Sequence, residues 1–193
     1  MSDPKILVFA GSIRTGSHNA RLAALAVKLI TLEGGDVTRI SLQDFPMPLY
    51  DGDVEASAGP PEHAVKLKRM IMQHAGVFIA APEYNASLTP LLKNAIDWMS
   101  RVRDGAEPPL AAFRSRVFAL ASASPGNLGG YRSLMALRQV LELGCGATVL
   151  PEQVAVRDAP NAFDEDDNLR DPRTGQAFLA LLRRLVDAAR YLR

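Results

Sequence analysis

The sequence predicts one α/β domain, residues 1–193, built on a doubly wound parallel sheet with helices on both faces. Two observations lead to this prediction: short runs of uninterrupted apolar residues, and helical periods of apolar residues between those runs. Strands buried on both faces give continuous apolar runs, because helices cover each side of a parallel sheet. The alternation of strand and helix indicates right-handed βαβ units, and the length of 193 residues suits a single domain.

Five segments are expected to form the strands of this sheet. Four of them are continuous apolar runs, at residues 6–10, 77–81, 117–121 and 147–150. The fifth segment, residues 36–42, is less apolar, but it contains the β-branched residues Val37, Thr38 and Ile40. Residues of this type favour strands, so we expect an edge strand there.

Apolar residues with helical spacing predict five helices between and after these strands. The apolar positions lie within residues 22–30, 64–71, 92–99, 134–141 and 178–192. The third helix has a clear start, because Thr89 is a typical N-cap and Pro90 suits the first helical position. Residues 41–61 and 152–174 show no regular period and are rich in proline, glycine or acidic residues, so we expect irregular loops there.

Composition argues against several classes of protein. The 22 basic and 21 acidic residues are well mixed and leave a net charge of +1, which argues against nucleic-acid binding and against an acidic electron carrier. The first apolar run is too short for a signal peptide, and no stretch approaches the about 18 apolar residues of a membrane span. We therefore expect a cytoplasmic protein without a membrane partner.

Cysteine and histidine usage predicts neither a disulfide framework nor a metal site. Cys145 is the single cysteine and is expected to be a buried structural thiol. The three histidines lack a cysteine or carboxylate at ligand spacing. The acidic segment that begins at Asp164 starts with the spacing of an EF-hand loop, but Leu169 replaces the required glycine, and a solvated loop is expected.

The candidate site lies in the turns that follow the apolar runs, because open α/β sheets bind ligands beyond the carboxyl ends of their strands. The first turn, residues 11–19, has the two-glycine spacing of a Walker A loop, but Ser17 stands where that motif has lysine. It also lacks the third glycine of the dinucleotide fingerprint. Its helix N-terminus, hydroxyl groups and Arg14 suit a phosphate monoester. The alternative is an ordinary Gly/Ser turn with a surface arginine.

Two further turns are expected at the same edge of the sheet. In residues 82–88, backbone groups and the side chains of Tyr84 and Asn85 can grip a flat heterocycle; the alternative is a capped connection with a half-buried tyrosine. In residues 122–130, three glycines and two serines allow close approach of the backbone to a ligand; the alternative is a flexible loop. The three turns together indicate a nucleotide-like ligand.

These segments resemble the NAD(P)H-dependent FMN reductases of the flavodoxin-like superfamily, a family that includes quinone, chromate and azo-dye reductases. The resemblance runs from Lys5 to about Pro151. Its most specific part is Pro82-Glu83-Tyr84-Asn85 with Leu92-Lys93-Asn94-Ala95-Ile96-Asp97-Trp98 behind it. The other matching residues are Gly11, Ser12, Arg14, Gly16, Ser17, Asn19, residues 45–50, Ser122, Ser124, Pro125, Gly126, Gly129 and Gly130.

The resemblance implies a flavodoxin-like fold with a five-stranded sheet of order 2-1-3-4-5, FMN as cofactor, and NADPH or NADH as hydride donor. It implies that Ser12, Arg14, Ser17 and Asn19 hold the FMN phosphate. It places Pro82, Glu83, Tyr84 and Asn85 along the isoalloxazine ring, and Ser122, Ser124 and Gly126 on the other side of the flavin. No residue is expected to be catalytic, because the cofactor carries the chemistry.

The function implied is transfer of hydride from NAD(P)H through FMN to quinone-like or other small acceptors, with ping-pong kinetics at one open flavin face. The alternatives are a flavodoxin-like electron carrier, a flavin-binding regulatory protein without nicotinamide turnover, and a relative that has lost flavin. The family resemblance also implies a homodimer or homotetramer. Tyr50, Trp98 and Met99 are expected to be exposed and so to suit such an interface.

Overall fold

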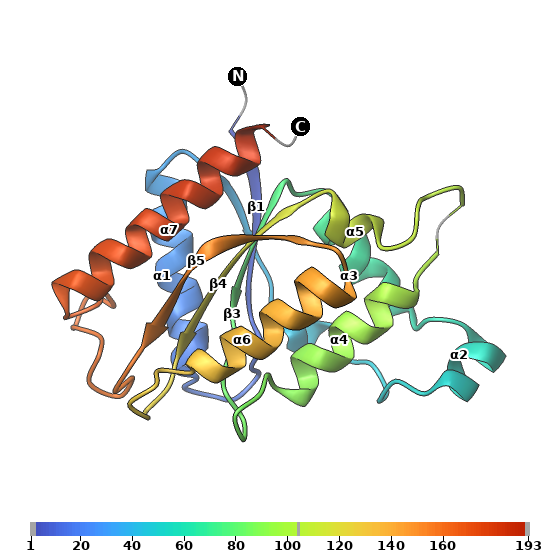
Figure 1. Ribbon diagram of the computed structural model, residues 1–193, viewed down its shortest axis with the longest axis horizontal. Coiled ribbons are helices and arrows are strands. Elements are labelled where there is room, and N and C mark those ends of the chain that lie inside the picture. The colour runs from blue at the N-terminus through green and yellow to red at the C-terminus, as the bar shows by residue number, and fades with distance from the viewer. Residues whose placement is uncertain (1–2, 104, 192–193) are drawn as a thin grey trace.

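Across the described residues, 3–103 and 105–191, the computed structural model contains a central sheet of five parallel strands (Figure 1). The strands are β1 (Lys5–Ala10), β2 (Asp36–Arg39), β3 (Gly76–Ala80), β4 (Val117–Ala123) and β5 (Thr148–Val156). Their order is β2-β1-β3-β4-β5, and each neighbouring pair is parallel. The predicted doubly wound sheet and its order 2-1-3-4-5 are therefore confirmed.

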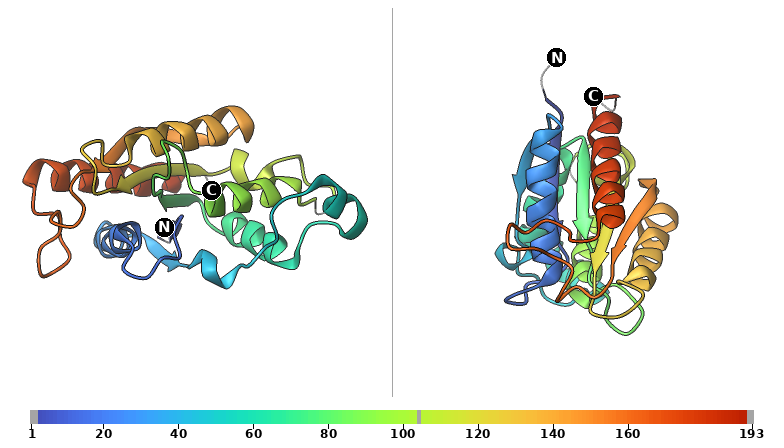
Figure 2. Two further views of the ribbon diagram at one scale, coloured as in Figure 1. Left: turned by 90° about the horizontal axis from the view of Figure 1, so that it is seen from below. Right: turned by 90° about the vertical axis from the view of Figure 1, so that its left-hand side faces the viewer.

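Helices cover both faces of this sheet. One face carries α1 (His18–Leu32) and α7 (Pro172–Tyr191), which lie in front of the sheet in the right-hand view of Figure 2. The other face carries α3 (Glu62–Met72), α4 (Pro90–Arg101), α5 (Ala111–Arg114) and α6 (Tyr131–Gln139). A π-helical turn, η2 (Val140–Gly144), continues α6, and the 3₁₀ turn η1 (Leu42–Asp44) and the short helix α2 (Gly52–Ala58) follow β2.

The sheet divides the apolar core into two parts, because successive side chains of a strand point to opposite faces. Ile6, Val8 and Phe78 pack toward α1 and α7, where the rings of Phe78 and Phe178 meet edge-on at 5.7 Å. Leu7 and Phe9 pack toward the other group of helices. Every residue of β3 and β4 is buried, which explains why these strands appear in the sequence as unbroken apolar runs.

Three strands differ from the prediction by two residues or more, and one of them is β4, which continues from Ala121 to Ala123. β2 ends at Arg39, because Ser41 begins η1 by accepting a hydrogen bond from the backbone N–H of Gln43. β5 continues to Val156, into residues that we expected to form an irregular loop. It bulges there: Phe118 of β4 pairs with Val149, but Leu120 pairs with Gln153. The polar residues Glu152 and Gln153 lie on this edge strand. They interrupt its apolar run, so the run in the sequence ends before the strand does.

The segment 41–61, also expected to be irregular, contains η1 and α2. α2, whose residues are all described, buries none of them, so it has no apolar period that the sequence could reveal. The first residue of α7 is Pro172, so part of the second expected loop is helical as well. The last apolar position predicted for that helix, Leu192, lies outside the described residues. None of the described helices is long and apolar enough to span a membrane.

The expectation of exposed interface positions on α4 is wrong for Trp98 and Met99, which are both buried. The indole N–H of Trp98 donates to the carbonyl of Pro48 at 2.8 Å, and its ring meets the ring of Tyr50 edge-on. Tyr50 is half-buried, and its hydroxyl donates to the carboxylate of Glu55. These residues fasten the segment before α2 to the body of the protein and are not a free surface.

Candidate functional site

The three predicted turns meet at the carboxyl edge of the sheet, at the lower side of Figure 1. The N–H of Gly11 donates to the carbonyl of Ala80, at the end of the neighbouring strand. The buried hydroxyl of Thr89 donates to the carbonyl of Gly11 at 2.7 Å and also caps α4 by accepting from the N–H of Leu92. The first and second turns are thus held together by hydrogen bonds between residues far apart in the sequence.

The first turn presents unused hydrogen-bond donors. Within the part of the chain that is described, the backbone N–H groups of Ser12, Ile13, Thr15 and Gly16 donate to no protein acceptor. Gly16 has a φ of +69°, a conformation that glycine adopts without strain. The N-terminus of α1 follows directly and adds the positive end of a helix dipole. This set of donors suits a bound anion.

Arg14 is the cation of this turn. Its guanidinium is exposed and donates to carbonyls of its own loop, those of Thr15 and Gly16, at 3.3 and 3.2 Å. Partial burial, together with the positive charges of Arg14 and Arg21, lowers the pKa of His18 and so favours its neutral form. The positive potential of the turn therefore comes from Arg14 and from the backbone.

The side chains of Ser17 and Asn19 form hydrogen bonds within the protein. The hydroxyl of Ser17 caps α1 by accepting from the N–H of Ala20. Asn19 is only 3% exposed, and its side-chain amide forms two hydrogen bonds with Ala123 at the end of β4. It donates to the Ala123 carbonyl at 2.8 Å and accepts from the Ala123 N–H at 3.0 Å. Asn19 therefore fixes the first turn of α1 against the beginning of the third predicted turn.

The second turn is a tight hairpin that projects Tyr84 from the edge of the sheet. Tyr84 and Ser87 exchange two backbone hydrogen bonds of 3.0 Å, and the two residues between them, Asn85 and Ala86, have φ values of +48° and +65°. Two-residue hairpin loops favour such conformations, although alanine adopts them only with strain. The side chain of Tyr84 is left half exposed.

Glu83 points away from the exposed edge and toward α6. Its side chain is only 8% exposed and forms an ion pair with Arg132. Its carboxylate also accepts from the backbone N–H of Arg132 at 3.1 Å and, at 3.4 Å, from that of Ser133. The sequence did not single out Arg132 or Ser133; the only signal was their position in the first turn of a helix that follows Gly129 and Gly130.

Ser122 lies below the third turn and is fully buried. We placed it in the turn because the apolar run ends at Ala121, but β4 continues to Ala123. Gly130, with a φ of +87°, covers it so closely that a Cβ on Gly130 would lie 1.8 Å from the Ser122 hydroxyl. That hydroxyl has no hydrogen-bond partner among the described residues. Ser124 and Gly126, in contrast, lie in the accessible part of the turn.

The predicted site residues thus fall into two groups. One group faces the accessible edge and consists of Ser12, Arg14, Tyr84, Asn85, Ser124 and Gly126. The other group has side chains that are buried or occupied behind that edge and consists of Ser17, Asn19, Pro82, Glu83 and Ser122. The structure brings all of them to one end of the sheet.

The other side chains that we considered in the sequence, those of Cys145 and Asp164, have structural roles. Cys145 is buried, as predicted, and burial raises the pKa of its thiol to about 11. The carboxylate of Asp164 accepts from the N–H groups of Asp166 and Asn168 and so shapes its own loop. Within residues 3–103 and 105–191, no three His, Cys, Asp or Glu side chains are grouped as metal ligands.

Comparisons with known proteins agree with this geometry. The family model of the NADPH-dependent FMN reductases matches residues 4–161. An NAD(P)H-dependent FMN reductase of Pseudomonas aeruginosa is 33% identical over 195 residues, covering 99% of this chain and 98% of that protein. A quinone reductase of Escherichia coli is 37% identical over 137 residues, 71% of this chain and 69% of that protein. Among solved structures, the flavoenzyme NAD(P)H:(acceptor) oxidoreductase FerB of Paracoccus denitrificans has a TM-score of 0.77 at 26% identity, covering 97% of each chain.

Replacement of Asn19 by alanine should destabilise the protein even without flavin. The change leaves the buried N–H and carbonyl of Ala123 without partners, which costs roughly 2–4 kcal/mol in the free energy of unfolding. Urea denaturation of the protein without added flavin measures this loss. Asn127→Ala, on the exposed part of the third turn, is the control and should change stability by less than about 0.5 kcal/mol. Equal stability of the two variants would contradict the role given to Asn19.

Proposed function

Because this chain belongs to the NADPH-dependent FMN reductase family, we propose that it passes hydride from a nicotinamide to quinone-like or other small acceptors in two half-reactions at one site. As a member of that family it is an enzyme, an NAD(P)H-dependent oxidoreductase with FMN as its cofactor. The proposal goes further in three respects: the residues that hold FMN, the ping-pong order of the reaction, and the class of acceptor.

The single observation that carries the proposal is the set of unused donors in the first turn. Four backbone N–H groups without a partner among the described residues, the N-terminus of α1 and the exposed side chain of Arg14 match the charge and the acceptor oxygens of a phosphate monoester. We assign the FMN phosphate to this turn, held by Ser12, Arg14 and Ser17. Asn19 supports the same turn from behind through its two bonds to Ala123.

The other two turns suit the ring system of the cofactor. We assign the backbone of Pro82 and Glu83, with Tyr84 and Asn85, to one side of the ring. The accessible part of the third turn, with Ser124 and Gly126, is assigned to the other side. FMN, when bound, supplies hydride transfer between donor and acceptor at its ring. This chain binds and orients the ring and leaves one face open.

The open face is the reason for proposing a ping-pong order. A half-exposed tyrosine on a projecting hairpin can stack against a flat nicotinamide or a flat quinone, but one such position accommodates only one of them at a time. Relatives named quinone reductase support a quinone-like acceptor. The homodimer or homotetramer and the cytoplasmic location stay predictions from the family resemblance.

Steady-state kinetics test this function directly. The purified protein supplied with FMN should show the visible absorption of bound flavin and oxidise NADPH or NADH in the presence of a quinone. Double-reciprocal plots at several quinone concentrations should give parallel lines, the pattern of a ping-pong reaction. Intersecting lines would refute the shared site, and a protein that takes up no FMN would refute the assignment of the three turns.

Arg14→Ala should weaken FMN binding but not riboflavin binding. Removal of a charge-assisted donor to phosphate costs about 1.5–3 kcal/mol, roughly a 10- to 150-fold increase in the Kd for FMN. Riboflavin has no phosphate, so its Kd should be the same for the variant and the wild type. Fluorescence titration of the apoprotein with each flavin measures both constants.

Arg39→Ala is the matched control for the loss of one positive charge near the first turn. Arg39 lies at the end of β2, beside this turn, and donates to the carbonyl of Ala20. We expect this variant to bind FMN within about twofold of the wild type, since surface charges interact weakly. A parallel loss of FMN and riboflavin affinity in Arg14→Ala would show that Arg14 has a structural role only.

Tyr84→Ala should leave FMN bound but impair the reaction. Loss of an aromatic stacking contact costs about 0.5–1.5 kcal/mol, so kcat/KM for NAD(P)H should fall roughly 2- to 10-fold at saturating FMN. Asn85→Gly, which keeps the positive φ of the hairpin, should show a smaller effect of the same kind. Tyr191→Ala, at the exposed end of α7, is the control and should behave like the wild type. Unchanged kinetics in both hairpin variants would make this turn a simple connection.

A further inference from the structure

We propose that Glu83 is a positioning residue: its carboxylate fixes the second turn to the N-terminus of α6 and so sets the distance between the second and third turns. The inference rests on the proposed function, in which these two turns hold the two sides of the flavin ring. It gives the Glu83 side chain a role of its own, beside the expectation that residues Pro82 to Asn85 lie along the ring. We call the contacts among Glu83, Arg132 and Ser133 the Glu83 clamp.

The first argument is that α6 receives its cap from Glu83. The residue at its N-cap position, Gly130, has no side chain with which to cap the helix, and helices usually begin at Ser, Thr, Asp or Asn for that purpose. The N–H groups of Arg132 and Ser133 donate instead to Oε2 of Glu83, at 3.1 and 3.4 Å. Glu83 and Arg132 are 49 residues apart in the sequence, so the cap joins two separate turns.

The second argument is that the charge of Glu83 is balanced within the clamp. A carboxylate whose side chain is only 8% exposed loses most of its hydration and needs compensation from the protein. Nε of Arg132 donates to Oε1 at 2.8 Å, and Nη2 of Arg132 donates to the same oxygen. The positive end of the α6 dipole also favours an anion at this position. Both carboxylate oxygens of Glu83 therefore accept hydrogen bonds from α6, and these bonds fix the orientation of the side chain.

The third argument is a second link at the same place. The hydroxyl of Ser133, which is fully buried, donates to the carbonyl of Pro82 at 2.8 Å. Both residues that precede the Tyr84 hairpin are thus bonded to the first turn of α6. On the other side of α6's start, Gly130 packs directly on Ser122 of β4. The hairpin, the end of β4 and the start of α6 are therefore joined by direct contacts.

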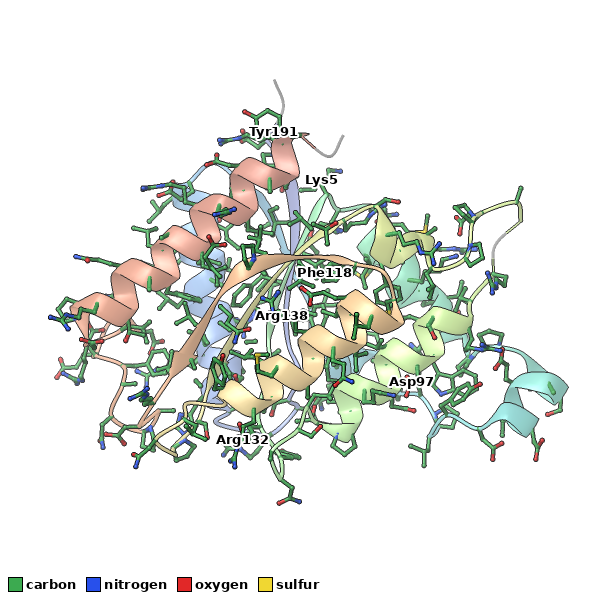
Figure 3. All side chains as sticks on the ribbon, in the orientation of Figure 1. Lys5, Asp97, Phe118, Arg132, Arg138 and Tyr191 are labelled. Atoms are coloured by element: carbon green, nitrogen blue, oxygen red, sulfur yellow. The ribbon has the colours of Figure 1, made fainter. Side chains whose placement is uncertain are left out.

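The Glu83 clamp holds the second and third turns in a fixed position relative to each other. The hairpin contains two residues with positive φ, and the third turn has glycine at three positions, so neither would hold a fixed position by its own conformation. Figure 3 shows Arg132 at the start of α6, beside the second turn, and Arg138 farther along the same helix. Only the first of these arginines can affect the distance between the two turns.

A double-mutant cycle on Glu83 and Arg132 tests the proposal. We expect Glu83→Ala and Arg132→Ala each to raise the Kd for FMN at least about threefold, and the Kd for riboflavin by the same factor. The effects should be equal because the clamp acts on the ring site and not on the phosphate turn. The double variant should bind both flavins about as well as Glu83→Ala alone, because without the carboxylate the Arg132 side chain has lost its partner in the second turn. Titration of the apoprotein with each flavin measures these constants.

Arg138→Ala is the matched control. Arg138 also lies on α6 and is also ion-paired, to Glu142, and it donates to the carbonyl of Leu150 on β5. Its loss should leave both flavin constants within twofold of the wild type. If Glu83→Ala is poorly folded by circular dichroism, Glu83→Gln replaces it in the cycle, since it keeps the shape and loses the charge.

Three results would overturn the clamp. Weaker flavin binding in Glu83→Ala but not in Arg132→Ala would show that the ion pair with Arg132 does not position the second turn, because Arg132→Ala keeps the two backbone N–H bonds to the carboxylate. Unchanged flavin binding in both variants, with a lower unfolding midpoint, would leave the clamp a purely structural role. Additive effects of the two changes on the stability of the apoprotein would show that the pair is not coupled. A wild-type protein that binds no flavin would overturn the proposed function, and the coupling in the apoprotein would still be measured independently.

Discussion

Parallel hydrogen bonding among β1, β3 and β4 determines where the three turns of the candidate site lie. Ala10 is in register with Ala80, and Ala80 with Ala121, so the three central strands reach the same edge of the sheet at the same level. Because all three run in one direction, the three turns that follow them must emerge side by side. The burial of these strands on both faces keeps that register in place, since a slip of one residue would exchange the faces of every side chain.

The edge is then made rigid by side chains that bind backbone groups of a neighbouring turn. Thr89 bonds to Gly11, Asn19 bonds to Ala123, and Ser133 bonds to Pro82, each at 3.0 Å or less. All three side chains are buried, where an unmade hydrogen bond would be costly. The result is an accessible edge of the sheet that rests on a set of buried polar contacts.

Sequence reasoning was accurate where the signal is local or repeats with a regular period. The apolar runs of the central strands, the Thr89-Pro90 start of α4 and the stripe on α7 follow directly from burial and capping. It failed where the decisive partner is distant: the Glu83 carboxylate bonds to residues 49 and 50 positions later, and nothing near Glu83 indicates them. It also failed at the ends of strands, where Ser122 and Gln153 continue β4 and β5 after the apolar signal has stopped.

The burial of Cys145 has a chemical consequence for an enzyme whose relatives reduce quinones. Quinones are electrophiles that add to ionised thiols, and the ionised form is the nucleophile of cysteine. Burial raises the pKa of the Cys145 thiol to about 11, so the thiolate is strongly disfavoured at pH 7, and the side chain is buried on the face of α6 and η2. The single sulfhydryl of this chain is therefore protected from arylation by the kind of molecule that the protein is proposed to turn over.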